Sequence, residues 1–188
     1  MERKEAIKRT AAIMGGIIFA PNIFGVLNGC TPSKERWMPV LFSRKQADLT
    51  TSLAEVILPG SDTPGAIDAG VPGFIEKMVL EVYNQEQRDM FISGLDHFDD
   101  ECRNNTGKYF SDLHSDAQLT YATEQNRLAI ENEMHDGLQF FLIFKELTMV
   151  GFFTSEIGAT QVLRHEHVPG YFDGCVPFEE IGRTWATG

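Results

Sequence analysis

The sequence predicts a mainly α-helical, single-domain bundle followed by an ordered, aromatic C-terminal coil rich in Pro and Gly. Apolar residues recur at three- and four-residue spacing through most of residues 43–153, which is the period of an amphipathic helix. The alternating pattern of strands is missing apart from one short piece. The chain has 188 residues, about one domain, and its 14 Phe against 2 Trp and 4 Tyr predict a core built from Phe.

Capping and turn residues delimit the first two helices. Ser43 is a candidate N-cap for a helix that ends at Leu58, before Pro59 and Gly60. Pro72 suits the first turn of a second helix, which ends near Val82. The apolar face expected for the second helix consists of Phe74, Ile75, Met78, Val79 and Val82.

Three further helices follow in the same way. Residues 85–103 form an amphipathic helix that Asn104 to Gly107 end, and Ser115 with Gln118 resembles a capping box for a helix reaching about Met134. Residues 138–153 are apolar almost all round, which predicts a position at the centre of the bundle. The stripe of the 85–103 helix consists of Met90, Phe91, Leu95, Phe98 and Cys102. From Arg164 onward we expect ordered coil.

Residues 1–29 predict an export signal, because a basic start precedes the uncharged and mostly apolar residues 11–24. Leu27-Asn28-Gly29-Cys30 resembles a bacterial lipobox, in which Cys30 would be acylated and become the mature N-terminus. The basic start also resembles a twin-arginine signal with Lys4 in place of the second Arg, so both export routes stay open. The alternative is an amphipathic helix packed on the domain. We expect a tether at 30–41, a domain at 42–188, and a membrane-associated periplasmic lipoprotein.

Composition excludes several classes of protein. The net charge of -11 argues against a nucleic-acid binder, which needs a basic face. No stretch reaches the roughly 18 to 20 uncharged apolar residues that span a bilayer. Three cysteines are too few for a disulfide scaffold. Cys102 lies on an apolar stripe and is expected to be buried, whereas Cys175 is a candidate for a disulfide to a partner chain.

Motifs for cofactors and for common hydrolytic chemistry are absent from the sequence. It contains no G-x-G-x-x-G opening a helix, no P-loop, no H-E-x-x-H, no G-x-S-x-G and no C-x-x-C-H. We therefore expect no cofactor in this chain. One alternative is a small metalloprotein that uses His165 and His167, with Asp173 as a third ligand; otherwise these are polar residues on a surface loop. The acidic run from Asp99 to Glu101 is expected to be a solvated face.

Two regions carry a resemblance to a known family. They read ILPGSDTPGAIDAGVP at 57–72, and GFFTSEIG at 151–158 followed by PGYFDGCVP at 169–177. In order and spacing they resemble the small-subunit family of gluconate 2-dehydrogenase, also called subunit 3, over about residues 42–177. The resemblance implies an accessory, non-catalytic subunit. Its partner would be a flavoprotein of the glucose-methanol-choline class that holds FAD and acts on sugars or sugar acids, often with a c-type cytochrome as third subunit.

A partner interface is expected on three segments. The 57–72 loop presents Asp62, Thr63, Pro64 and Asp68, although the two aspartates could equally serve as turn and helix caps. Ser155 and Glu156 follow the most apolar helix, which they could simply terminate. The remaining candidates are on the C-terminal coil, which could instead fold back on its own bundle: Tyr171, Phe172, Cys175 and Trp185. A stand-alone periplasmic lipoprotein of the same fold is the alternative to an accessory subunit.

Overall fold

The chain divides into two units, 1–36 and 37–188. The structure, a computed structural model, describes residues 37–136, 140–168, 170 and 173–186, all of which belong to the second unit. The predicted export signal and Cys30 lie outside the described residues. The described residues are mainly helical, so the predicted fold class is confirmed. The elements are α2 (Arg44–Ile57), α3 (Val71–Glu81), α4 (Gln85–Thr106), η1 (Phe110–Asp112), α5 (Ser115–Asp136), α6 (Phe140–Phe153), η2 (Gly158–Val162) and α7 (Phe178–Ile181).

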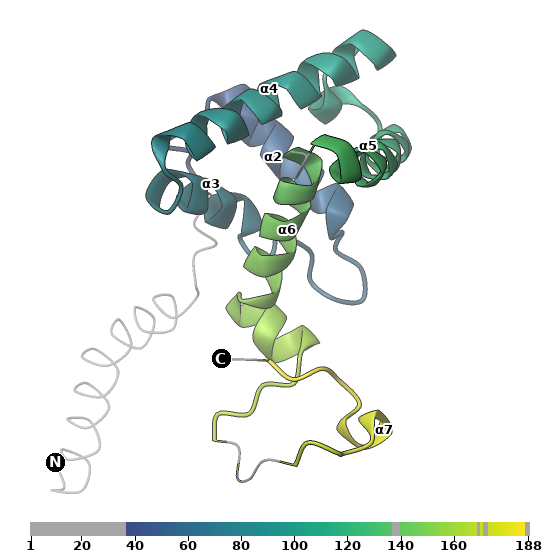
Figure 1. Cartoon of the computed structure of the whole chain (residues 1–188). Helices are drawn as coiled ribbons and strands as arrows, with labels where there is room; N and C mark the ends of the chain where they lie inside the picture. Colours follow the sequence, from purple (N-terminus) through teal and green to yellow (C-terminus); the bar gives the residue numbers. More distant parts are fainter. Residues whose placement is uncertain (1–36, 137–139, 169, 171–172, 187–188) are drawn as a thin grey trace, which may run out of the picture. The chain divides into compact units, whose positions relative to one another are not determined.

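The apolar helix α6 lies at the centre of the bundle, as the sequence predicts. It contacts α3 and α5 on either side, as well as α2 and α4 (Figure 1). Two glycines permit this close packing. A Cβ at Gly151 of α6 would stand 2.5 Å from the Phe74 ring of α3, and one at Gly94 of α4 would overlap the ring of Phe140. Aromatic rings thus lie directly on helix backbone where these helices meet.

The core is a chain of contacting Phe rings contributed by different helices. Phe91 of α4 stacks on Phe144 of α6 at 6.3 Å and meets Phe140 edge-on at 5.4 Å. Phe98, two turns further along α4, meets Phe110 at 5.4 Å and Tyr121 of α5 at 5.5 Å. Such pairs contribute about 0.5–1.5 kcal/mol each beyond burial of their area. The expectation of a Phe-built core is confirmed.

Most of the predicted helix ends are found. Ser43 caps α2 in a reciprocal pair with Gln46, and Pro72 lies in the first turn of α3. The 85–103 helix is longer than predicted, because α4 continues to Thr106 and ends at Gly107 in the left-handed conformation. The capping box predicted at Ser115 is wrong. His114 accepts the first helical hydrogen bond, and Gln118 donates its side-chain amide to the Phe110 carbonyl instead.

The predicted apolar faces of α3 and α4 each include one residue that is exposed in the structure. Val82 is 63% exposed and Met90 is 64% exposed. Val82 follows the last turn of α3. Met90 lies beside the buried stripe of α4, which starts at Phe91 and recurs at four- and three-residue spacing, so it does not face the core. The other members of the α4 stripe, including Cys102, are buried as predicted.

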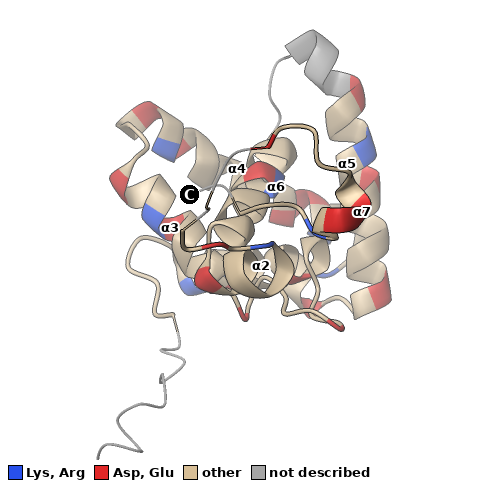
Figure 2. Ribbon diagram, turned by 90° about the horizontal axis from the view of Figure 1, so that it is seen from below, with Lys and Arg blue, Asp and Glu red and all other residues tan. Residues whose placement is uncertain are grey.

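The described residues after Arg164 are mostly coil, and they contain one short helix that the sequence did not indicate. That helix, α7, carries Glu179 and Glu180 and shows as an acidic turn in Figure 2. An isolated parallel bridge pairs Arg164 with Trp185. Within the described residues, no helix has both the length and the apolarity needed to cross a bilayer.

Candidate partner interface

The loop between α2 and α3 is held by its own backbone. Ala66 donates to the Leu58 carbonyl at 2.8 Å, and Val71 donates to the Ala66 carbonyl at 3.0 Å, so both ends of the loop are tied to Ala66. Ala66 itself is fully buried. At the tip, the Ser61 amide donates to the Thr63 carbonyl at 2.9 Å. The result is a closed loop whose base belongs to the core and whose tip faces solvent.

A close approach between two glycines closes this loop. A Cβ on Gly65 would overlap the backbone nitrogen of Gly60, so no larger residue fits at 65 without moving backbone. Gly60 is less constrained, since a Cβ there would meet its nearest atoms at 3.7 Å. Gly70, at φ 71°, turns the chain into α3 in a conformation that favours glycine.

The loop brings the four predicted interface residues together, with different surroundings. Asp62 and Thr63 are exposed at the tip, and Pro64 is half-buried. Asp68 is exposed, and its carboxylate accepts the Gly65 amide at 3.3 Å. This bond stabilises the turn, which is the alternative to an interface role for Asp68. Asp62 and Thr63 are therefore the loop side chains best placed to contact another molecule.

Ser155 is used by the fold at the end of α6. Its hydroxyl donates to the Phe152 carbonyl at 2.6 Å and accepts the Gly158 amide at 2.9 Å. A Cβ at Gly158 would overlap the Phe152 carbonyl oxygen, so this turn also depends on glycine. Of the predicted pair, Glu156 alone is exposed. The turn leads into η2, a π-type turn of the kind that is frequent at functional sites.

The C-terminal candidates are only partly described. Tyr171 and Phe172 lie outside the described residues. Cys175 is an exposed free thiol, and its amide donates to the Asp173 carboxylate at 3.1 Å. The Trp185 ring lies 4.3 Å from the Arg164 guanidinium and stays 40% exposed. The coil thus closes on Arg164 through Trp185.

The three side chains considered as possible metal ligands are exposed. His165 and His167 both face solvent, as does Asp173. In the described part of the chain, no three His, Cys, Asp or Glu side chains form a group that could hold a metal ion.

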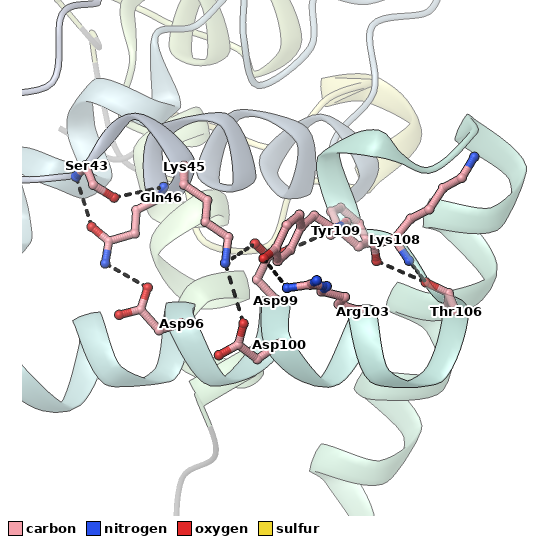
Figure 3. A network of polar contacts seen from close by, with 11 residues as sticks. Ser43, Lys45, Gln46, Asp96, Asp99, Asp100, Arg103, Thr106, Lys108 and Tyr109 are labelled. Atoms are coloured by element: carbon pink, nitrogen blue, oxygen red, sulfur yellow. Dashed lines mark hydrogen bonds and ion pairs between the residues drawn. The ribbon is translucent and has the colours of Figure 1, made fainter.

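A polar network that the sequence did not reveal joins α2 to α4 (Figure 3). Asp99 is only 2% exposed; it accepts the Phe110 amide at 2.9 Å and pairs with Lys45 at 3.3 Å. Lys45 also approaches Asp100 at 3.5 Å. The prediction of a solvated acidic face is therefore wrong for Asp99. Partial burial works to lower the pKa of Lys45, but the hydrogen bond and charge of Asp99 outweigh it and raise that pKa above 10.5.

Tyr109 completes this network from the turn after α4. The Lys45 ammonium lies 3.9 Å from the centre of its ring, and the Arg103 guanidinium lies 4.8 Å from it. Arg103 also donates to the Tyr109 hydroxyl at 2.6 Å. Two cations thus hold one ring, and the whole arrangement fastens three segments of the fold to one another. The network thus has a structural role in joining these segments.

Sequence comparison identifies the family. Residues 44–170 match the family model described as gluconate 2-dehydrogenase subunit 3, which covers more than half of the chain. Neither the curated proteins nor the solved structures yielded a match. The matched range includes α2 to η2 and the whole 58–70 loop, and the family description is that of a subunit of a dehydrogenase. The chain belongs to the gluconate 2-dehydrogenase subunit 3 family.

Proposed function

We propose that this chain is the non-catalytic small subunit of a membrane-associated, FAD-dependent dehydrogenase acting on a sugar or sugar acid. It binds and stabilises a catalytic flavoprotein of the glucose-methanol-choline class and assists its export to the periplasm. FAD resides in that partner, and a c-type cytochrome is a further candidate subunit. The observation that carries the proposal is the family match over residues 44–170.

The proposed contact with the flavoprotein uses the tip of the 58–70 loop and the C-terminal coil. Support comes from the exposure of Asp62 and Thr63 on a loop whose base is buried, because a rigid exposed loop loses little entropy on binding. Trp185 is an exposed aromatic residue of the kind enriched at interfaces. Glu156, Tyr171, Phe172 and Cys175 remain candidates for the same contact, Cys175 through a disulfide between chains.

Attachment to the membrane is proposed through Cys30, after removal of residues 1–29 during export. The support is the sequence alone, since a basic start, an apolar run and Leu27-Asn28-Gly29-Cys30 resemble a lipoprotein signal. In this proposal, Cys30→Ala moves the isolated subunit from the membrane fraction to the soluble fraction. Persistent membrane attachment of that variant contradicts the lipid anchor.

Co-purification from the native host tests the proposal as a whole. A tagged full chain should bring down an FAD-containing protein in equal amount, and the complex should reduce an artificial electron acceptor with a sugar or sugar acid. The tagged chain expressed alone should show neither flavin absorbance nor turnover. Purification of the chain from membranes without any flavoprotein would favour the stand-alone lipoprotein, and turnover by the chain alone would make it an enzyme.

A further inference from the structure

Glu76 of α3 is a buried carboxylate that binds the segment entering the bundle. It is 5% exposed. One of its oxygens, Oε1, accepts the backbone amides of Val40, Leu41 and Phe42 at 2.9, 2.7 and 2.8 Å. The other, Oε2, accepts the indole N–H of Trp37 at 2.8 Å. We call residues 37–42 the strap. Four hydrogen bonds from the strap thus converge on one side chain.

The two ends of the strap pack against the helices. At its end, Phe42 is buried and stacks on Phe91 of α4 at 6.3 Å. At its start, the Trp37 indole covers Gly73 of α3, where a Cβ would stand 3.2 Å from the ring. Between them, Met38 and Val40 are 80% and 83% exposed. The middle of the strap therefore gains little from apolar burial, and the bonds to Glu76 hold it.

The carboxylate depends on the strap as much as the strap depends on it. Its four donors are one indole and three amides, and none of these carries a positive charge. Consecutive amides that converge on one oxygen form an anion-binding nest. If the strap amides and the indole were removed, the buried carboxylate would lose these four hydrogen bonds. Leaving a buried carboxylate without donors costs far more free energy than leaving an exposed carboxylate without them. The charge of Glu76 and the conformation of the strap are therefore mutually required.

We propose that Glu76 is the clip that locks the strap, and so fixes the point at which the N-terminal part of the chain joins the domain. Lifting the whole strap breaks all four hydrogen bonds, since every donor bonds the same carboxylate. Under this proposal the domain ordered by its own contacts starts at Trp37, ahead of residue 44 where the family match begins.

The clip also limits the greatest possible distance between Cys30 and the domain. This step rests on the proposed anchoring at Cys30. A fully extended chain spans at most about 3.5 Å per residue, so Cys30 and Trp37 can be at most about 25 Å apart, whereas Cys30 and Phe42 can be at most about 40 Å apart. A closed clip would therefore hold the domain, with any bound flavoprotein, closer to the bilayer than an open one.

Hydrogen exchange on the purified full chain tests the clip. Glu76→Ala should speed exchange at the amides of Val40, Leu41 and Phe42 by at least about tenfold relative to the amides inside α6. The control is Asp99→Asn, which alters another buried carboxylate that accepts a backbone amide, that of Phe110. The control should leave the strap amides protected relative to α6. Equal acceleration in both variants would overturn the proposal.

A milder pair of variants gives an answer if Glu76→Ala fails to fold. Glu76→Gln keeps an oxygen for the three amides but sets an N–H₂ donor against the indole N–H of Trp37. In a Trp185→Phe background, which leaves Trp37 as the single Trp of the chain, Trp37 emission should shift toward that of a water-exposed indole. Strap amides should exchange less fast than in Glu76→Ala. Unchanged Trp37 emission would contradict the geometry of the clip.

The coupling between the two side chains is a further check. Trp37→Phe alone should destabilise the protein, whereas the same change added to Glu76→Gln should cost less, because the hydrogen bond is already lost and only the packing of the indole on Gly73 and Phe42 remains to be removed. Full additivity would overturn the proposal. All these readouts use the isolated chain. Failure of membrane attachment or of flavoprotein binding would therefore count against the proposed function and leave the clip intact.

Discussion

Two segments outside the main bundle helices, the 58–70 loop and the C-terminal segment 164–186 with its short helix α7, are ordered in different ways. The loop buries Gly65 and Ala66 and ties both of its ends to Ala66. The C-terminal segment buries none of its described residues. It closes through the amide of Arg164 to the Thr184 carbonyl, the amide of Ala186 to the Arg164 carbonyl, and the contact of Arg164 with Trp185.

Because the two segments are ordered by different contacts, their free energies of local opening should differ. The loop is ordered because its base is part of the core, so it should open only when the bundle unfolds. The C-terminal segment is ordered by a few contacts that are local to it, so it should open alone and often. Changes in the loop should therefore affect the whole domain, whereas changes in the C-terminal segment should stay local.

The largest effect is expected for Gly65→Ala. The new methyl group would overlap the backbone of Gly60, and moving backbone in a closed loop should cost about 3 kcal/mol. For a domain of this size the melting temperature should fall by about 6–12 °C. Gly60→Ala is the matched control, because a Cβ there makes only ordinary contacts and should change the melting temperature little. Equal falls in melting temperature for the two variants would contradict the conclusion that the close approach at Gly65 ties the loop to the core.

Alkaline pH should lower the free energy of unfolding of the bundle through ionisation of Tyr121. Burial raises the pKa of Tyr121 to about 12 from its usual value of 10. The folded state thus holds this proton more tightly than the unfolded state. The contribution of Tyr121 to stability is complete below pH 10 and is lost as the pH rises from 10 to 12.

Comparison with Tyr121→Phe isolates that contribution, since Tyr83 and Cys102 also have raised pKa values. The wild type should lose more of its melting temperature between pH 10 and 12 than the variant does. The protection of the Ala66 amide, taken as its exchange rate relative to the hydroxide-catalysed intrinsic rate at each pH, should fall together with the stability of the bundle over this range. The Ala186 amide should show little protection throughout, and a parallel loss of protection at both amides would argue against separate stabilities.

A smaller effect is expected for Trp185→Ala. The contact with Arg164 contributes about 0.5–1 kcal/mol at an exposed site, so the melting temperature of the domain should hardly change. Limited proteolysis between residues 165 and 183 should accelerate by a few fold, because the closure of the segment is weakened. A large fall in melting temperature would mean that the segment is part of the cooperative unit after all.

The smallest effect on stability is expected for Asp62→Ala at the loop tip. Asp62 is exposed, and exposed substitutions usually change stability by less than about 0.5 kcal/mol. Under the proposed function the same change should weaken binding of the flavoprotein, measured as a higher dissociation constant. Ser52→Ala, at a half-buried position of α2 outside the loop, serves as a control for binding. Stronger destabilisation than in Gly60→Ala would place Asp62 in the folding of the loop.

Helices and their packing faces could be predicted because their signals are local. The spacing of Phe91, Leu95, Phe98 and Cys102 is visible in one stretch of chain, and all four are buried. The pairing of Ser43 with Gln46 likewise spans a single turn. The predicted apolar faces are too wide at their edges, since Val82 follows the end of α3 and Met90 lies beside the stripe that starts at Phe91, and both are exposed.

Polar contacts within the core could not be predicted, because their partners are distant in sequence. Asp99 is in an acidic run that resembles a solvated face, yet it is buried by Lys45 and the amide of Phe110. Glu76 has donors more than thirty positions away, and nothing in its own stretch marks it. For the candidate interface, Asp62 and Thr63 are exposed, but exposure alone identifies no partner, so the interface stays a prediction.

The closure of the C-terminal segment has a consequence for a nicked chain. While the backbone between Arg164 and Trp185 is continuous, the two ends are held near each other at high effective concentration, so weak contacts suffice. A single cut in this stretch would turn the closure into an association of two separate pieces. Four hydrogen bonds made by Arg164 and Arg183 and one cation–π contact would be too weak to sustain such an association. The released peptide would diffuse away and take the only described C-terminal Trp with it.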